Sequence, residues 1–229
     1  TTSSISCISY LRGLMAELTF GRWPNMRPAL PTIAVAPGAW RYAAACFVAA
    51  VIGVVVFPPL AGLALALGVG ILWFHRDPPR QPPAAGIVAP ADGRVSVLRE
   101  EGDRVRVGIF MNVTDVHVNR APVAGTVESV EHRPGAYKPA FSKDSDRNER
   151  VVIDCGDYEV ALIAGWFARR IHPYVAAGDD LVCGQRIGHV SFGSRADVLL
   201  PPRYEQADVR VAVDETVTAG ETRLVEPEQ

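Results

Sequence analysis

Two apolar runs dominate the pattern of hydrophobic and polar positions, Tyr42–Phe57 and Leu60–Phe74, and neither they nor the residues between them carry a charge. Two successive prolines, Pro58 and Pro59, separate the runs. Because proline cannot donate a helix hydrogen bond and clashes with the preceding turn, each run is predicted to form its own helix. Helices of this length cover about 23 Å, against roughly 30 Å for a bilayer core. We therefore expect a tight helical hairpin over residues 42–74 that dips into a membrane or just crosses it.

Basic residues flank this hairpin on both sides, Arg27 and Arg41 before it and His75, Arg76 and Arg80 after it. Cytoplasmic flanks of membrane segments are enriched in Lys and Arg, so we expect both ends, and the domain that follows, on the cytoplasmic face of the cell membrane. The alternative is a hairpin buried in a soluble protein, but two helices that are apolar all round would need a much larger protein to bury them.

The segment before the hairpin, Ile5–Phe20, mixes apolar residues with Arg12 and Glu17. This pattern fits either an amphipathic helix at the membrane interface or an ordinary surface helix. We expect residues 1–80 to form an N-terminal membrane-associated helical region.

The pattern changes after residue 80 to short stretches with β-type alternation, broken by Gly, Pro and Asp, and helix signals are few. The predicted strands are Gly93–Leu98, Arg104–Met111, Gly125–Val130, Arg150–Asp154, Glu159–Ala164 and Val209–Val213. The fold class is therefore mainly β (α+β), with a β-rich catalytic domain over residues 81–229.

A weak internal repeat lies within this domain. Ala89–Val95 and Ala121–Val127 each read as a Pro-x-x-Gly-x-Val turn that leads into a strand. Such units are typical of the sandwich-like barrels of biotinyl and lipoyl carrier domains, so we expect a β-sandwich or barrel-like architecture with biotinyl-like turn repeats. A swinging-arm carrier is not expected, because Lys138 and Lys143 are the two lysines of the chain and neither lies at a hairpin tip.

Composition excludes several classes of function. The net charge is −2 and the chain has no basic run, so nothing favours nucleic acid. The four cysteines (Cys7, Cys46, Cys155 and Cys183) match no zinc or iron–sulfur spacing, so we expect no metal and read them as reduced and mostly buried.

Several ordered motifs together carry more information than any one of them. Val190–Pro201 reads VSFGSRADVLLP, with Gly193-Ser194 at its centre. Upstream stand Ala89–Gly93 (APADG), Asp115–Pro122 (DVHVNRAP), Arg133–Gly135 (RPG) and Asn148–Arg150 (NER). In this order, from about Phe74 to Leu224, the chain resembles the short form of the phosphatidylserine decarboxylase family.

The resemblance implies a self-cleaving proenzyme. The Ser194 hydroxyl would attack the Gly193 carbonyl, and the chain would separate into a large subunit (1–193) and a small subunit (194–229) whose first residue becomes a covalent pyruvoyl cofactor. This group would form a Schiff base with the amine of phosphatidylserine and release CO2 to give phosphatidylethanolamine. Loss of CO2 from an amino acid leaves a carbanion, and a ketone can absorb that charge as pyridoxal phosphate does. The bilayer is the expected partner, and the sequence leaves open whether the chain forms a homo-oligomer.

The resemblance also implies roles for individual residues. Asp92 matches the family's Pro-Ala-Asp-Gly aspartate, and His117 matches the first histidine of the His-x-x-His motif of longer members. Arg120 stands where the second histidine is expected, so the self-cleavage base is either His117 for both steps or His132 in its place. Arg195, Arg120 and His132 are the candidate substrate-binding residues, Arg195 by bidentate contact with a phosphate or carboxylate.

Three other functions remain open at this point. The chain could be a non-enzymatic membrane-anchored β-domain adaptor, which accounts for the turn repeats and the hairpin. It could be a membrane-associated serine hydrolase that uses Ser194. It could apply the same pyruvoyl chemistry to another amine, although the apolar hairpin favours a lipid.

Overall fold

The computed structural model describes residues 34–36, 38–138, 146–165, 170–191 and 193–227. The chain divides into two compact units, Thr1–Leu30 and Pro31–Gln229, and every described residue belongs to the second. The predicted helix over Ile5–Phe20 lies outside the described residues.

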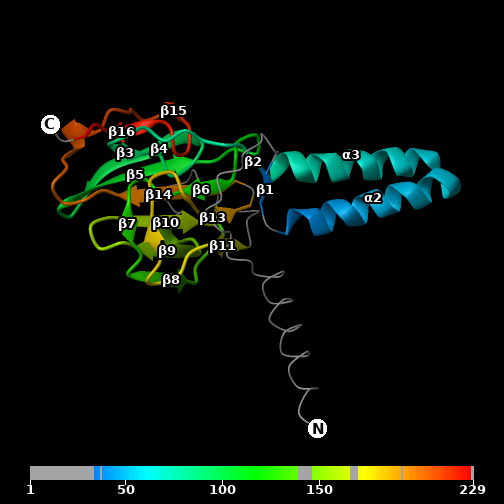
Figure 1. Cartoon of the computed structure of the whole chain (residues 1–229), viewed down its shortest axis with the longest axis horizontal. Coiled ribbons are helices and arrows are strands. Elements are labelled where there is room, and N and C mark those ends of the chain that lie inside the picture. The colour runs from blue at the N-terminus through cyan, green and yellow to red at the C-terminus, as the bar shows by residue number, and fades with distance from the viewer. Residues whose placement is uncertain (1–33, 37, 139–145, 166–169, 192, 228–229) are drawn as a thin grey trace, which may run out of the picture. The chain divides into compact units, whose positions relative to one another are not determined.

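The apolar tract forms the predicted helical hairpin. Helix α2 (Ala39–Val56) begins three residues before the apolar run, and α3 (Pro58–Phe74) follows it side by side (Figure 1). Pro58 and Pro59 occupy the first turn of α3 instead of a linker, because the first N–H groups of a helix have no partner to lose. Among the described helices, α2 is the one long and apolar enough to cross a membrane.

The two helices pack through small residues. The buried positions are Ala39, Ala43, Ala50 and Gly53 on α2 and Ala61, Ala64, Gly68 and Phe74 on α3. A Cβ atom on Gly53 would lie 3.1 Å from the Ala61 Cα atom, so the backbones approach closely at this point. Large side chains such as Val55 and Leu63 are exposed. Small residues inside and large apolar residues outside suit a lipid environment, and burial of only 17% of the α2 segment argues against a soluble core hairpin.

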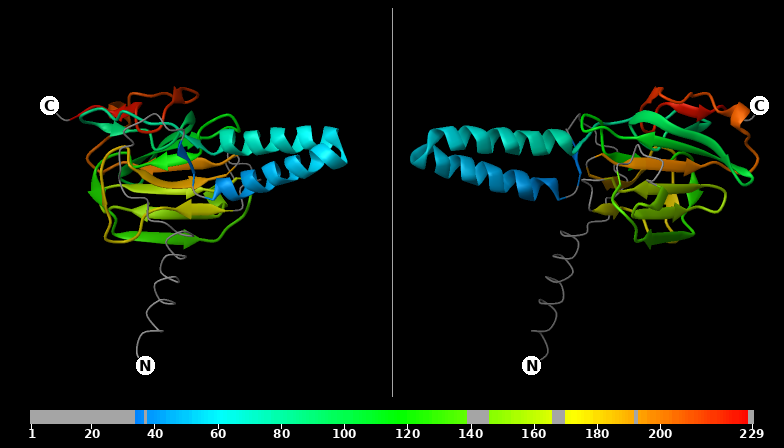
Figure 2. Two further views of the ribbon diagram at one scale, coloured as in Figure 1. Left: turned by 45° about the vertical axis from the view of Figure 1, so that its right-hand side comes forward. Right: turned by 180° about the vertical axis from the view of Figure 1, so that it is seen from behind.

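The main sheet has seven strands, and each is antiparallel to its neighbours. Its spatial order is β15 (Thr216–Val217), β4 (Gly93–Glu101), β5 (Arg104–Phe110), β14 (Arg195–Leu199), β10 (Glu159–Ile163), β9 (Arg150–Asp154) and β8 (Ser129–Arg133). Figure 2 shows the strands of the β-rich part from two sides.

Smaller sheets complete the β-rich part. One has the order β11 (Ile171–Pro173), β13 (Arg186–Val190) and β6 (Val118–Arg120). Three strand pairs are formed by β12 (Asp180–Leu181) with β7 (Gly125–Thr126), β16 (Arg223–Val225) with β3 (Ile87–Val88), and β1 (Ala34–Val35) with β2 (Arg76–Asp77). A short 3₁₀ helix, η2, covers Gln206–Asp208.

The main core lies on one face of the seven-stranded sheet. Side chains alternate between the faces of a strand, so Val151 and Ile153 of β9 join the large buried cluster, whereas Val152 joins a separate one. Ile187 of β13 and Leu224 of β16 pack into the same large cluster from the smaller sheets. The predicted class, mainly β with an N-terminal helical hairpin, is confirmed.

The weak sequence repeat corresponds to a structural repeat. In the first copy, Gly93 pairs with Val217, and the Gly220 N–H donates to the Ala89 carbonyl oxygen (2.8 Å). In the second, β7 pairs with β12 at Gly125 and Leu181, and the Gly184 N–H donates to the Ala121 carbonyl oxygen (2.8 Å). Both copies therefore use a Gly-containing turn from a later segment to close the same turn–strand unit.

Two strand predictions were wrong. Gly125–Val130 divides into β7 and β8, because Val127 turns into the core and its N–H donates to Asp179 instead of to a neighbouring strand. Val209–Val213 is not a strand: Val209 makes one isolated bridge to Val225, and the chain then turns near Asp214, whose φ is +73°. The domain boundary near residue 80 stays a prediction.

Candidate active site

Ser194 lies immediately before β14 and is fully buried, with 0% of its surface exposed. Its carbonyl oxygen accepts the Met111 N–H at 2.9 Å, and its hydroxyl Oγ lies 4.0 Å from the Met111 sulfur. Gly193 before it has a φ of +62°, a left-handed conformation that favours glycine. The Gly193-Ser194 motif therefore places a buried hydroxyl group next to a glycine carbonyl group, immediately before the central strand β14.

Asp92 precedes Gly93, whose backbone lies against the end of β5, and the described contacts of the Asp92 carboxylate are with Ala219 and Arg80. A Cβ atom on Gly93, whose φ is +137°, would lie 2.1 Å from the Phe110 carbonyl oxygen and 3.3 Å from the Met111 Cα atom, so only glycine fits. The Asp92 carboxylate accepts the Ala219 N–H at 2.8 Å and pairs with the Arg80 guanidinium at 2.7 Å. Burial raises the pKa of Asp92, against the opposing effect of these two partners.

His117 has a defined tautomer. Its Nδ1 lies 2.9 Å from the Asp115 carbonyl oxygen, which can only accept, so Nδ1 carries the proton and Nε2 carries a lone pair. Nε2 is buried and has no hydrogen-bond partner among the described residues. Burial lowers the pKa of His117 to about 4, so the ring is neutral at pH 7. Phe74 at the end of α3 packs on this ring with centroids 4.5 Å apart.

Further histidines surround His117. His189 of β13 stacks on His172 at 4.7 Å, lies 6.0 Å from His75, and shares a 2.8 Å hydrogen bond with the Tyr174 hydroxyl. Burial, followed by repulsion from the other histidines, lowers the pKa of His189 to about 3. His117 and His189 are therefore neutral imidazoles at pH 7.

Arg120, the residue at the position of the second family histidine, is fully engaged elsewhere. Its guanidinium pairs with the buried Asp77 at 2.6 Å and donates to the carbonyl oxygens of Gly184 (2.9 Å) and Pro78 (3.1 Å). Asp77 also pairs with Arg186. Arg120 thus ties β6 to the segment that leaves α3, and substrate binding by Arg120 stays a prediction.

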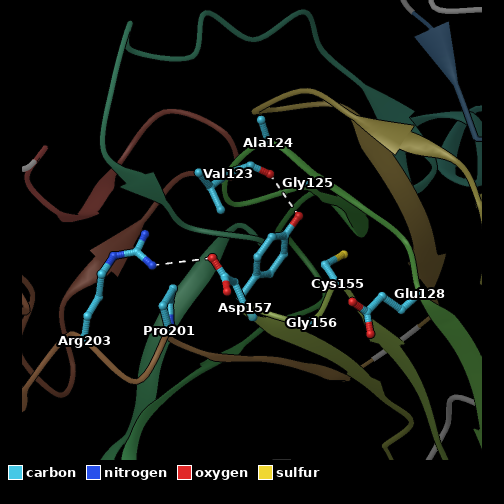
Figure 3. A pocket seen from close by; sticks show the side chains of 10 residues that line it. Val123, Ala124, Gly125, Glu128, Cys155, Gly156, Asp157, Pro201 and Arg203 are labelled. Atoms are coloured by element: carbon cyan, nitrogen blue, oxygen red, sulfur yellow. Dashed lines mark hydrogen bonds and ion pairs between the residues drawn. The ribbon is translucent and has the colours of Figure 1, made fainter.

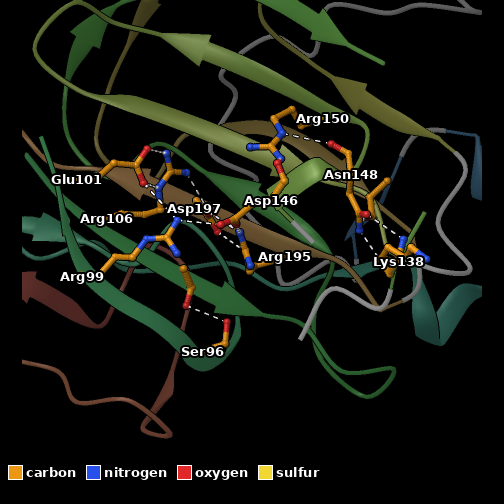
Figure 4. A network of polar contacts seen from close by, with 12 residues as sticks. Ser96, Arg99, Glu101, Arg106, Lys138, Asp146, Asn148, Arg150, Arg195 and Asp197 are labelled. Carbon is orange, nitrogen blue, oxygen red and sulfur yellow. Dashed lines mark hydrogen bonds and ion pairs between the residues drawn. The ribbon is translucent and has the colours of Figure 1, made fainter. Parts of the chain in front are cut away.

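Arg195, directly after the serine, enters an ion-pair network (Figure 4). Ala196 and Val198 of β14 belong to the main core, so Arg195 lies on the opposite face of the sheet. Its Nε and Nη2 atoms lie 2.7 and 2.9 Å from the Asp197 carboxylate, and Nη2 lies 2.7 Å from Asp146. Arg106 of β5 approaches Asp197 at 3.0 Å. Burial opposes the Arg195 charge, but the attraction of both carboxylates raises its pKa. Substrate binding by Arg195 stays a prediction, and its described contacts are internal.

His132 lies apart from Ser194. The register aligns it through Val151 and Leu162 with Ala196, three strands away in the main sheet. At about 4.8 Å per strand this is about 14 Å. The His132 side chain is 57% exposed and pairs with Glu149 at 2.8 Å. The structure does not bring His132 together with Ser194.

Two site residues were missed by the sequence interpretation, Met111 and Asn119. Met111 contacts Ser194 through both its N–H and its sulfur, and the Asn119 amide lies 3.5 Å from the same sulfur. The available signal was the alternation along Asp115–Pro122, because residues two apart on a strand share a face and Asn119 follows His117 by two.

A separate hollow of about 250 Å³ lies near β7 and the β9–β10 turn (Figure 3). Tyr158 closes it by donating to the Val123 carbonyl oxygen at 2.9 Å, and Arg203 faces Asp157 at 3.5 Å. Its lining residues are Val123, Ala124, Gly125, Glu128, Cys155, Gly156, Asp157, Tyr158, Pro201 and Arg203, so it is distinct from the serine site.

Comparison with known proteins gives a consistent result. The family model described as phosphatidylserine decarboxylase matches residues 70–225. A protein of Halobacterium salinarum that carries the name of an archaetidylserine decarboxylase proenzyme is 57% identical over 84% of this chain and 98% of its own length. A phosphatidylserine decarboxylase proenzyme of Streptomyces griseus is 51% identical over 69% of this chain and 75% of its own.

Proposed function

The chain belongs to the phosphatidylserine decarboxylase family, and from this premise we propose that it cleaves itself between Gly193 and Ser194 and decarboxylates phosphatidylserine to phosphatidylethanolamine and CO2. The covalent cofactor would be a pyruvoyl group derived from Ser194. The subunits would be residues 1–193 and 194–229 of one precursor.

The burial of Ser194 is the observation that carries this proposal. A serine that attacks an external substrate has to be reachable, whereas a serine that attacks the carbonyl before it does not. The left-handed Gly193 offers an acyl group without a side chain, and the Met111 N–H holds the Ser194 carbonyl oxygen at 2.9 Å. These features fit a precursor poised for attack on its own backbone.

Self-cleavage can be written with the chain's own residues. The Ser194 oxygen bonds to the Gly193 carbonyl carbon as the peptide C–N bond breaks, and the hydroxyl proton ends on the Ser194 nitrogen. A base then removes the Ser194 Cα proton, the Cβ–O bond breaks, and Gly193 leaves as a carboxylate. The dehydroalanine left behind tautomerises and takes up water with loss of ammonia. His117 Nε2, neutral and unpaired, is the proposed base for both proton transfers.

Once formed, the ketone supplies an electron sink for the charge that loss of CO2 creates. The residues around Ser194 fit such a group: the Met111 N–H can hold the adjacent amide oxygen, and Arg195 is fixed by Asp197 and Asp146. We propose that these contacts keep the new chain end in place after the backbone is cut. His117 is then available to the substrate carboxylate or to reprotonate the product.

The location of His117 supports a lipid substrate. Phe74, the last residue of α3, packs on its ring, and Arg76 donates to the Thr114 carbonyl oxygen at 2.6 Å. A hairpin embedded in the cytoplasmic side of the bilayer would thus bring lipid headgroups towards the catalytic histidine. The names of the two relatives share the serine headgroup and differ in the lipid that bears it. Archaetidylserine is therefore a second candidate substrate, favoured by the 57% identity.

The other functions weighed from the sequence have less support. An adaptor role leaves the match to a decarboxylase family unexplained. A serine hydrolase needs a serine that reaches both its substrate and a base, whereas Ser194 is 0% exposed and its described hydroxyl contact is a sulfur.

The test compares Ser194→Ala with Ser96→Ala, a half-buried serine on β4, as a matched control. Wild type and the control should give two chains on a denaturing gel and release CO2 from phosphatidylserine vesicles, and Ser194→Ala should remain one inactive chain. Cyanoborohydride should attach the substrate to the small chain of the wild type. Normal processing of Ser194→Ala, or attachment to the large chain, would contradict the proposal.

A further inference from the structure

Asn119 on β6 is a buried polar side chain that has no nitrogen or oxygen partner among the described residues. It is 0% exposed, its Oδ1 atom has no hydrogen-bond partner in the part of the chain that the structure describes, and its amide nitrogen contacts the Met111 sulfur at 3.5 Å. A thioether is a weak acceptor. Leaving a buried amide unsatisfied costs about 1–3 kcal/mol, so such a group calls for a reason other than stability.

The position of Asn119 suggests that reason. The Ser194 hydroxyl lies 4.0 Å from the same sulfur, so the two contacts limit the distance between this hydroxyl oxygen and the Asn119 amide nitrogen to at most about 7.5 Å. His117, whose Nε2 is also buried and unpaired, precedes Asn119 by two residues. Two unsatisfied polar atoms, Asn119 Oδ1 and His117 Nε2, therefore lie on one short segment, and Asn119 shares the Met111 sulfur with the serine.

Resting on the proposed self-cleavage, we propose that Asn119 is a catalytic residue of that step. Its amide N–H, whose described acceptor is the weak Met111 thioether, leaves that sulfur to donate to the Gly193 carbonyl oxygen as this oxygen gains negative charge during attack by Ser194. The new O–C bond forms and the C–N bond breaks as described above, and the amide neither gains nor loses an atom. A donor in a dry site stabilises such an oxyanion strongly, because no water competes for it.

The chain offers a matched control in Asn148, which is also buried (2% exposed) but fully bonded. Its amide donates to the carbonyl oxygens of Lys138 (2.6 Å) and Ala164 (2.8 Å) and accepts the Lys138 N–H (2.8 Å). Asn148 therefore has the contacts of a structural asparagine, and Asn119 does not.

The test measures self-cleavage of freshly translated precursor against time, and thermal unfolding of the same variants with Ser194→Ala added so that all remain single chains. Asn119→Leu, which loses the donor with little change of shape, should slow cleavage about 100-fold or more. Asn119→Leu should unfold at the same temperature as its parent or higher, whereas Asn148→Leu should unfold at a lower one.

Hydroxylamine distinguishes formation of the ester from its later elimination, because hydroxylamine cuts an ester. Added hydroxylamine should not release the small chain from Asn119→Leu, since formation of the ester is the slowed step and the ester does not accumulate. Wild-type cleavage rates in Asn119→Leu, a marked loss of its thermal stability, or release by hydroxylamine would each overturn the role of Asn119. Failure of the wild type itself to cleave would instead contradict the proposed function.

Discussion

Asp197→Ala should strongly destabilise the precursor, because Asp197 neutralises two arginines inside the protein. Its carboxylate is 0% exposed and receives three hydrogen bonds, at 2.7 and 2.9 Å from Arg195 and at 3.0 Å from Arg106. The Arg195 side chain is 2% exposed and that of Arg106 is 10% exposed. Gly108 lies directly opposite on β5, and a Cβ atom there would be 2.7 Å from the Asp197 carboxylate.

The size of the expected loss of stability follows from the burial of these charged side chains. Removing one partner of a buried ion pair costs about 3–5 kcal/mol, because the remaining charge is left uncompensated. Arg106 keeps Glu101, and Arg195 keeps Asp146, so the lower half of this range is expected. For a chain of this size, each kcal/mol lowers the unfolding temperature by about 2–4 °C. The expected decrease is therefore on the order of 10 °C.

Thermal and urea unfolding in the uncleaved Ser194→Ala background measure this effect on a single chain. The control is Glu131→Ala, which breaks the Arg133–Glu131 pair, whose side chains are 53% and 57% exposed. That pair should contribute less than about 1 kcal/mol. If Asp197→Ala costs no more than Glu131→Ala, the network does not hold β14, and the internal role of Arg195 is wrong.

Two further predictions concern pH and the hairpin. Because burial lowers the pKa of His117 to about 4, the self-cleavage rate should stay level from pH 8 to about pH 5 and halve near pH 4, and a midpoint near 6.5 would contradict His117 as the base. Between pH 6.5 and 4 the unfolded chain binds more protons at His117 and His189, so unfolding measurements should show stability falling as the pH falls through this range. Gly53→Leu should lower the unfolding temperature in detergent micelles, because the new side chain meets the Ala61 backbone at 3.1 Å, whereas Gly62→Leu meets nothing within 4 Å and should not. Equal effects of the two leucines would refute the close α2–α3 packing.

Local pattern predicted much of this fold. The charge-free tract predicted the hairpin, and strict alternation in Arg104–Met111 predicted β5 almost to the residue. Val209–Val213 shows the same alternation but makes a single described bridge, between Val209 and Val225. The prediction failed because strand formation depends on a neighbouring strand that the sequence does not reveal. The helix start at Ala39 lay outside the apolar pattern because Trp40 and Arg41 continue the helix with exposed side chains.

The sequence also predicted one part of the candidate site and not another. The motif residues Asp92, His117 and Ser194 were identified from the sequence because each lies in a recognisable local string. The contacts of Arg120 with Asp77 and of Arg195 with Asp197 were not identified from the sequence. The sequence does not distinguish an arginine that binds a substrate from one that pairs with a buried carboxylate. Alternation along the sequence could have placed Asn119 on the same face as His117, but the Met111 sulfur that Asn119 and Ser194 share depends on how β6 and the end of β5 pack together.

The intact mass of the purified protein tests the central claim most directly. The account predicts two chains, residues 1–193 and 194–229, with the small chain blocked at its N-terminus and about 17 Da lighter than a chain beginning with serine, because a ketone replaces the amino alcohol of that residue. A single unmodified chain of 24.7 kDa, or a small chain that begins with an intact serine, would contradict it.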